Sequence, residues 1–320
     1  LLKPRKPFVF EVRDLWPELP REMGVITNPV ILWGMSILEW LSYNSARGCI
    51  GLSPGIVEGI KHRCRKSKPV AMIPNGCDLD LFCTSSRGSL AETPSSCRCK
   101  TQPETQKSKT DLSRTTDTPP RSAGLGESAP TDTFRAIFTG AHGMANGLDA
   151  VLDTSAVLKQ RGRQDIELVF IGDGKLKPQL VERTEREELT NCNFQDPIPK
   201  LELAGKIREF DAGMMILANV PAFYYGTSPN KFFDYIASGL PVINNYPGWL
   251  ADMINEHNCG FAVPPDDPQA FADALERLAD NPDQRQTMGK NARRLAETHF
   301  DRRQLAEQFA EFLEKTVDRA

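Results

Sequence analysis

The sequence predicts an α/β protein with two lobes, each built around a parallel sheet. Short apolar runs with the features of strands alternate with segments of helical periodicity, an alternation typical of parallel sheets. Glycine-rich turns lead from two of the strands into helices, as in ligand-binding α/β domains. With 320 residues, the chain is long enough to bury the cores of two ordinary domains.

The first lobe is assigned to residues 1–82. The chain starts with Leu1 rather than Met, and residue 7 already enters a strand, so we expect this Rossmann-like domain to be incomplete. The expected elements are a strand over 7–12, a helix over 28–47, a strand ending near Leu52, a helix to about Cys64 and a strand over 70–73.

Composition changes abruptly over residues 83–133. Ser, Thr, Pro, Lys and Arg dominate there, and large apolar residues almost vanish. Such a segment cannot bury enough apolar surface to offset its chain entropy. We therefore expect a disordered, low-complexity insertion between the two lobes.

The second lobe, residues 134–300, is expected to be one doubly wound domain, followed by an amphipathic helix over 301–320 that packs toward the first lobe. Asp267 as N-cap and Pro268 at the first helical position open a late helix of this lobe. The other expected elements are strands at 134–139, 167–171, near Asn193, 213–217 and 241–244, and helices at 148–159, 175–188 and 200–208.

The bulk composition excludes some classes of function. The net charge of −3 is too small for a nucleic-acid-binding protein, and no basic aromatic pattern of the RNA-binding kind is present. Eight cysteines at irregular spacings fit no zinc site, and no secretory signal precedes them, so a reduced, cytoplasmic setting is expected. The most apolar run, 29–38, is too short to span a bilayer, which takes about 20 residues.

Two features leave alternatives open. Five of the eight residues 61–68 are Lys or Arg, which fits either a solvated helix end or a patch facing anionic lipid headgroups. Trp33, Ile37, Trp40 and Leu41 fall on one helical stripe. We expect that stripe to lie in the core, and peripheral contact with the cytoplasmic face of the inner membrane is the alternative.

The first candidate binding loop, residues 140–147, follows the strand at 134–139. Its glycines let the backbone approach a ligand, and the next helix offers unpaired N–H groups and its positive dipole end to a phosphate. The spacing is not G-x-G-x-x-G, which disfavours a dehydrogenase, and a plain tight turn is the alternative. The candidate donor-binding residues here are Gly140, His142, Gly143 and Asn146.

A second loop-to-helix junction lies within residues 225–239. Ser228 is the expected N-cap and Pro229 the first helical residue. Lys231 then stands in the first turn, where a cation opposes the helix dipole unless an anion lies between, and Asp234 shares its face. A lysine that grips a diphosphate and a carboxylate that accepts ribose hydroxyls would explain this pair. An ordinary surface Lys–Asp pair is the alternative.

The candidate donor-binding residues of this second junction are Gly226, Thr227, Ser228, Asn230, Lys231 and Asp234. Both junctions lie at carboxyl ends of parallel strands, where open α/β sheets bind ligands. Two helix N-termini that converge on one diphosphate would stabilise a departing nucleoside diphosphate without a metal ion.

Several motifs occur in an order specific to one family. They lie at residues 13–17, 73–82, 168–174, 226–243 and 259–266. In them the chain resembles the family-4 retaining glycosyltransferases, which have the GT-B fold of two Rossmann-like domains facing a cleft. The first motif, Arg-Asp-Leu-Trp-Pro, is similar to the bacterial subgroup that builds surface polysaccharides, such as the fucosamine transferases of capsule and O-antigen assembly.

The departures from the family pattern concern the donor site. The family commonly has two Glu separated by seven residues, and here those positions are Gly226 and Asp234. The Arg and Lys that usually hold the diphosphate are absent from the first loop. The resemblance therefore implies that backbone amides, His142 and Lys231 bind the phosphates instead.

The resemblance also implies an acceptor side. Asp14 lies at a strand end facing the cleft in such a fold, where we expect it to orient an acceptor hydroxyl or take its proton. Arg13 is expected to steady a negatively charged group. The alternative is a buried Arg–Asp pair that fixes the loop. Asp78 and Asp80 mimic the Asp-x-Asp metal motif of a different glycosyltransferase fold, but a turn is expected here and no metal is assigned.

The implied function is transfer of a sugar, with amino sugars favoured, from a nucleoside-diphosphate donor to a lipid-linked saccharide with retention of configuration. The donor, with UDP preferred, is a substrate, so no cofactor is expected. Two other functions remain open. One is a sugar-nucleotide 2-epimerase of the same fold, which the motif over 228–234 disfavours, and the other is a remnant that binds the nucleotide sugar without turnover.

Overall fold

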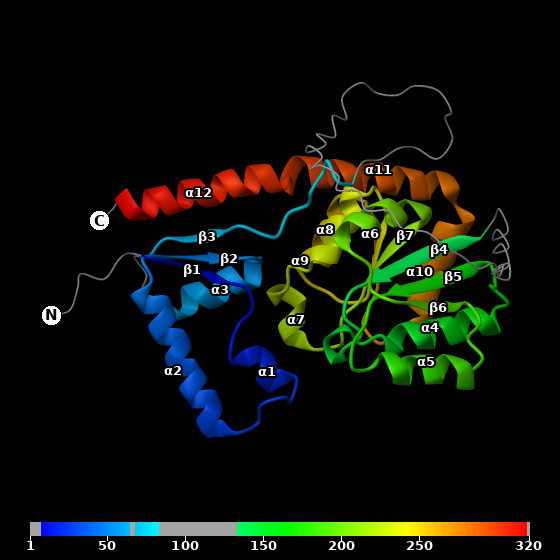
Figure 1. Cartoon of the computed structure of the whole chain (residues 1–320), viewed down its shortest axis with the longest axis horizontal. Helices are drawn as coiled ribbons and strands as arrows, with labels where there is room; N and C mark the ends of the chain where they lie inside the picture. Colours follow the sequence, from blue (N-terminus) through cyan, green and yellow to red (C-terminus); the bar gives the residue numbers. More distant parts are fainter. Residues whose placement is uncertain (1–7, 65–67, 83–132, 319–320) are drawn as a thin grey trace, which may run out of the picture. The chain divides into compact units, whose positions relative to one another are not determined.

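The computed structural model describes residues 8–64, 68–82 and 133–318 (Figure 1). The expected insertion over 83–133 therefore lies, apart from Thr133, outside the described residues. The described part contains two sheets, one of three strands and one of six, and every strand pair within them is parallel. The predicted α/β class is thus confirmed.

The smaller sheet has the order β1-β2-β3. Its two long helices begin after Asn28 and Ser53, which cap them with side-chain oxygens, and a proline follows each cap. Tyr43, Ile56 and Ile60 of these helices pack with β2 in one core cluster. The elements are β1 (Val9–Val12), α1 (Glu18–Glu22), α2 (Pro29–Ser45), β2 (Gly48–Gly51), α3 (Pro54–Arg63) and β3 (Val70–Met72).

The larger sheet has the order β6-β5-β4-β7-β8-β9, so the winding reverses between β4 and β7. This is the strand order of a doubly wound Rossmann domain, in which ligands bind beyond the strand ends at the reversal point. The strands are β4 (Phe134–Thr139), β5 (Ile166–Ile171), β6 (Cys192–Gln195), β7 (Ala212–Met215), β8 (Val242–Asn244) and β9 (Gly260–Ala262).

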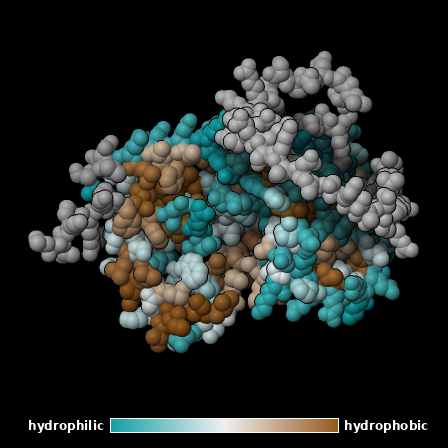
Figure 2. Space-filling view, in the orientation of Figure 1, coloured by the Kyte–Doolittle hydropathy of each residue, from teal (hydrophilic) through white to brown (hydrophobic). Residues whose placement is uncertain are grey.

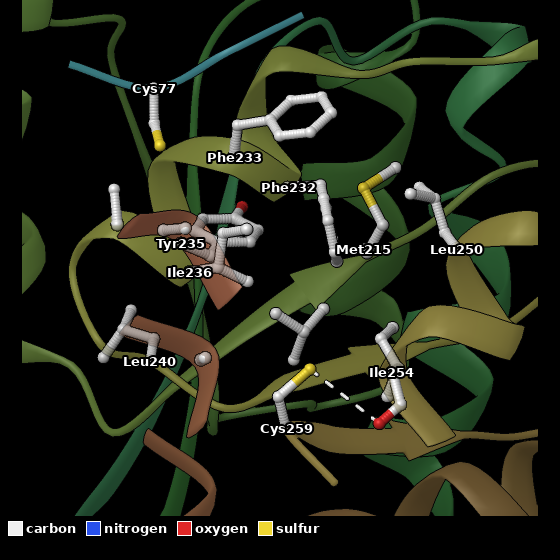
Figure 3. Packing of buried hydrophobic residues seen from close by; sticks show 14 of the residues in the cluster. Cys77, Met215, Phe232, Phe233, Tyr235, Ile236, Leu240, Leu250, Ile254 and Cys259 are labelled. Atoms are coloured by element: carbon white, nitrogen blue, oxygen red, sulfur yellow. Dashed lines mark hydrogen bonds between the residues drawn. The ribbon is translucent and has the colours of Figure 1, made fainter. Parts of the chain in front are cut away.

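Helices cover both faces of the larger sheet, and each face has its own buried cluster. One cluster gathers side chains of α8 and α9, including Phe232, Tyr235 and Ile254 (Figure 3). The helices are η1 (Met144–Asn146), α4 (Asp149–Gln160), α5 (Lys177–Arg186), α6 (Lys200–Lys206), η2 (Ile207–Glu209), α7 (Pro221–Gly226), α8 (Asn230–Ala237), α9 (Trp249–Glu256), α10 (Pro268–Asp280) and α11 (Pro282–His299).

Most sequence-predicted elements are confirmed, and the Asp267 side chain caps α10 by accepting from the amide of Ala270 at 2.9 Å. The prediction that Ser228 caps α8 is wrong, because α8 begins at Asn230 after Pro229 without a side-chain cap. The Ser228 hydroxyl instead accepts the amide of Asn75 at 3.2 Å. The sequence analysis also missed α1, α7, α9, β9 and α11.

Two chain segments run side by side where the polypeptide passes between the sheets. The amide of Cys77 donates to the carbonyl of Phe300 at 2.8 Å, and the amide of Arg302 donates to the carbonyl of Cys77 at 3.2 Å. Helix α12 (Arg302–Asp318) follows, and its Leu305 packs with Ile50 and Ile73 beside the smaller sheet. The C-terminal helix therefore contacts the first lobe after the second lobe is complete.

The outward face of α2 is apolar, so the expectation that its stripe belongs to the core is wrong. Trp33 is 67% exposed and Trp40 52% exposed. The buried side carries Glu39 and Tyr43 instead, and Glu39 pairs with Arg63 at 3.3 Å. Figure 2 shows the resulting hydrophobic surface over α2. The exposed apolar side chains of α2 are Val30, Ile31, Trp33, Ile37, Leu38, Trp40 and Leu41.

The structure describes only residues 61–64 and 68 of the basic run over 61–68. Residues 65–67 lie outside the described part of the chain. Arg63 pairs with Glu18 as well as Glu39, and Lys68 donates to the carbonyl of Tyr43. Lys61 is exposed. Arg63 is therefore engaged within the protein rather than presented to a headgroup.

Candidate functional site

A cavity of about 570 Å³ opens at the reversal point of the larger sheet. Its walls come from the loops after β4, β5 and β6 and from the first turns of α8. The residues that line the cavity include Thr139, Gly140, Gly172, Asp173, Lys200, Asn230, Lys231 and Asp234. The structure thus brings Gly140 of the first predicted junction together with Asn230, Lys231 and Asp234 of the second.

Glycines hold the loops after β4 and β5 in close contact. Gly140 has a φ of +131°, a backbone conformation that side chains disfavour. A Cβ on Gly172 would lie 1.9 Å from the carbonyl oxygen of Gly140. The predicted glycine-rich turn is therefore needed for the approach of these two loops, which form one wall of the cavity.

Lys231 places a cation at the N-terminal end of α8. Its Nζ donates to Oδ1 of Asn146 at 2.8 Å and lies 3.9 Å from the ring centroid of Phe138. Across the described residues, no carboxylate is recorded within ion-pair distance of this ammonium. Burial lowers the pKa of Lys231 to about 7. A cation with no anionic partner, next to the positive end of a helix, favours an anionic ligand in the cavity.

Tyr235 fixes this lysine's helix to the end of β4. Its hydroxyl accepts the amide of Thr139 at 2.9 Å and is fully buried. Gly213 of β7 makes room for it, since a Cβ there would lie 2.4 Å from the tyrosine ring. The sequence analysis missed this contact, which joins residues almost a hundred positions apart and leaves no local signal.

Asp234 lies one helical turn further along α8 and is only 7% exposed. Burial raises the pKa of its carboxyl group, and the charge of Lys200 opposes that rise. The Nζ of Lys200 lies 3.2 Å from Oδ1 of Asp234. Lys200 was not singled out in the sequence, because nothing near it in the chain shows that α6 begins beside α8.

The side chain of His142 does not line this cavity. It is fully buried, with Phe138 and Phe194 as ring neighbours at 6.0 and 5.7 Å between centroids. Burial lowers the pKa of His142 to about 4, so the ring is neutral near pH 7. Its amide donates to the carbonyl of Asp173 at 2.8 Å. The structure therefore places the His142 ring among core side chains, outside the lining of the cavity in which a phosphate contact was predicted.

The remaining predicted residues lie around other cavities. Asp14, Gly226 and Thr227 line a cavity of about 220 Å³. Arg13 and Asp14 line another of about 420 Å³ beside α2, where Arg13 pairs with Glu11 at 3.1 Å rather than with Asp14. The predicted buried Arg–Asp pair is thus not formed. Partial burial raises the pKa of the Asp14 carboxyl group. Gly143 has open space where a side chain would stand.

Among the described residues, no group of three His, Cys, Asp or Glu side chains could hold a metal ion. Asp78 is paired with Arg302 at 2.9 Å, and Asp80 is paired with Arg303. Among the described helices, none has the length and apolar content needed to cross a bilayer.

Comparison with known proteins places these observations in context. Residues 133–281 match the family model described as "Glycosyl transferases group 1". The chain is 26% identical over 194 residues to the alpha-D-kanosaminyltransferase of Streptomyces kanamyceticus, covering 57% of this chain and 46% of that protein. It is 27% identical over 173 residues to the amylovoran biosynthesis glycosyltransferase AmsK of Erwinia amylovora, covering 53% and 42%.

The whole-chain fold is also similar to a solved structure. HepE of Anabaena in complex with UDP superimposes with a TM-score of 0.67 and 16% identity, covering 97% of this chain and 72% of HepE. The fold is thus GT-B, as the sequence predicts. Residues 133–281 are thus similar to the group 1 glycosyltransferases. The chain spans less than half the length of the two curated relatives.

The lowered pKa of Lys231 predicts how the free energy of unfolding depends on pH. Because its pKa is lowered to about 7 in the folded protein, the folded state binds fewer protons than the unfolded chain between about pH 7 and 10. Its contribution to the free energy of unfolding therefore rises with pH across that window. We expect Lys231→Met to stabilise the protein by about 1–3 kcal/mol at pH 6 and by less at pH 9, as measured by urea unfolding.

The matched control is Lys290→Met, which removes an exposed lysine of α11. We expect it to change the free energy of unfolding little at either pH. If Lys231→Met is less stable than the parent at both pH values, the claim that the charged Lys231 destabilises the folded protein is contradicted.

Proposed function

We propose that this chain is the donor-binding part of a glycosyltransferase, with the nucleoside diphosphate of a nucleotide sugar in the 570 Å³ cavity. The observation that carries the proposal is the ammonium of Lys231, held at the N-terminus of α8 by Asn146 with no carboxylate partner among the described residues. A diphosphate there would pair with Lys231 and accept from the first amides of α8. Asp234 would accept ribose hydroxyls.

The reaction proposed is retaining transfer to an acceptor hydroxyl. The bond between the anomeric carbon and the diphosphate oxygen breaks. The acceptor oxygen forms its bond to that carbon on the same face, so the configuration is retained. The acceptor proton passes to Asp14, whose raised pKa suits a general base. Arg13 steadies an anionic group of the acceptor, and Lys231 stabilises the departing diphosphate.

The acceptor proposed is a lipid-linked saccharide in surface-polysaccharide assembly. The matched relatives include a protein of amylovoran biosynthesis and an aminosugar transferase by name, and HepE was solved with UDP. These names support a UDP-linked donor, with an amino sugar preferred. We further propose the fucosamine-transferase-like subgroup of capsule and O-antigen assembly. The resemblance of residues 13–17 to that subgroup adds to this support.

Peripheral contact with the cytoplasmic face of the inner membrane is part of the proposal. The outward face of α2 carries two tryptophans and no charged side chain. Two exposed cations lie near this face in the sequence. Arg47 follows the end of α2, and Lys61 lies in the last turn of α3. Apolar side chains flanked by cations suit the interface of an anionic bilayer. We therefore assign the face of α2 to a membrane surface.

Saturation-transfer NMR with UDP and GDP tests the donor site. We expect UDP to bind the parent chain, and Lys231→Ala and Asp234→Ala each to weaken binding at least tenfold, since each removes a charge-assisted contact. Lys290→Ala, a surface control, should bind as the parent does. If a folded parent binds neither nucleotide, the donor-site proposal is wrong.

Turnover separates the enzyme from its alternatives. The measured quantity is release of UDP from a UDP-sugar. Release that occurs only when a saccharide acceptor is present supports transfer. Epimerised donor without acceptor would indicate the 2-epimerase instead, and nucleotide binding without either product would indicate a non-catalytic remnant.

Sedimentation with vesicles tests the membrane contact. We expect the parent to bind vesicles that contain phosphatidylglycerol better than vesicles of phosphatidylcholine alone. The double change Trp33→Ser and Trp40→Ser should reduce binding at least tenfold, because two interfacial rings are lost. Leu201→Ser, which removes an exposed apolar side chain of α6, is the control. A parent that stays in the supernatant would refute the contact, and a dimer that the double change disrupts would assign the face to a second copy.

A further inference from the structure

A chain of alternating charges leads out of the donor cavity. Lys200 Nζ lies 3.2 Å from Oδ1 of Asp234 and 3.5 Å from Oδ2 of Asp78. On its other side, Oδ1 of Asp78 is 2.9 Å from Nε of Arg302. The four side chains come from α8, α6, the segment 73–82 and the start of α12. They therefore connect the cavity with both segments that cross between the sheets.

Lys200 is the cation of this charge series that lines the cavity. It is the first residue of α6, and its ammonium lies 5.7 Å from the ring centroid of Phe82. Both Lys200 and Asp234 line the cavity, whereas Asp78 and Arg302 do not. Removing Lys200 would leave Asp234 without its nearest cation and Asp78 with Arg302 alone.

Asp234 needs such a partner because it is buried. Burial favours the uncharged form of a carboxyl group, and a protonated acid accepts hydroxyl hydrogen bonds less well than a carboxylate. The charged and titratable groups that interact with Asp234 are Lys200, Arg302, Asp78, Cys77 and Tyr235. Of these, Lys200 opposes protonation most strongly and Asp78 promotes it.

We propose that Lys200 is a positioning residue of the donor site, which holds the Asp234 carboxylate ready for ribose hydroxyls and ties it to the two crossing segments. This rests on the proposed function for the nature of the ligand. In this role Lys200 does not bind the phosphates directly, and the two crossing segments help to position the carboxylate of Asp234.

The test compares Lys200→Met with Lys206→Met. Lys206 lies on the same helix, but its ammonium donates to Gln195 at 2.6 Å and is outside the charge chain. The Asp234 carboxyl carbon, assigned with Asp234→Asn, is followed by carbon-13 NMR across pH in the full chain. We expect its titration midpoint to rise by about one pH unit in Lys200→Met and to stay in place in Lys206→Met, because only the first loses a facing cation.

Affinity for UDP at pH 7 gives the second readout. We expect Lys200→Met to weaken binding about tenfold, with the deficit growing as pH falls, while Lys206→Met matches the parent. An unmoved midpoint overturns the proposal. So does tighter UDP binding by Lys200→Met, which would make Lys200 a competitor for Asp234. If the midpoint moves but the parent binds no UDP, the pairing stands and the proposed function fails.

Discussion

The cation of Lys231 at the start of α8 is the interaction on which the site depends. A helix N-terminus carries partial positive charge, and a lysine ammonium beside it is unfavourable unless an anion is present. Here Asn146 and the ring of Phe138 are the contacts recorded for that ammonium. Neither neutralises it. The position of this ammonium at the helix N-terminus is therefore unfavourable until an anion such as a diphosphate binds. Burial of the ammonium, which lowers its pKa to about 7, disfavours the charged form as well.

Several contacts make this arrangement possible. The hydroxyl of Tyr235 ties α8 to the end of β4, and Gly213 gives the tyrosine ring its space. Gly172 lets the loop after β5 meet Gly140, which closes the cavity wall. These residues hold the lysine where two strand ends diverge, so the larger sheet's topology decides where the charge lies.

Periodicity predicted β4 to β8 of the larger sheet but not β9, α7, α9 or α11. Loop chemistry predicted that Gly140, Lys231 and Asp234 belong to one site. Both signals are local. The sequence could not show that Lys200 meets Asp234, because the two lie on helices whose proximity depends on the whole domain. It placed the tryptophans of α2 in the core because amphipathic helices usually bury their apolar stripe. In the structure the face of α2 that is buried carries Glu39 and Tyr43, and Glu39 pairs with Arg63.

The most direct test of the account is the titration of Lys231 itself, followed by NMR of lysines labelled at the ε-carbon, with and without saturating UDP. The account predicts a midpoint near pH 7 in the free protein and a midpoint at least two units higher with UDP, because a bound diphosphate favours the charged ammonium. A Lys231 that titrates like an exposed lysine and does not respond to UDP would contradict it.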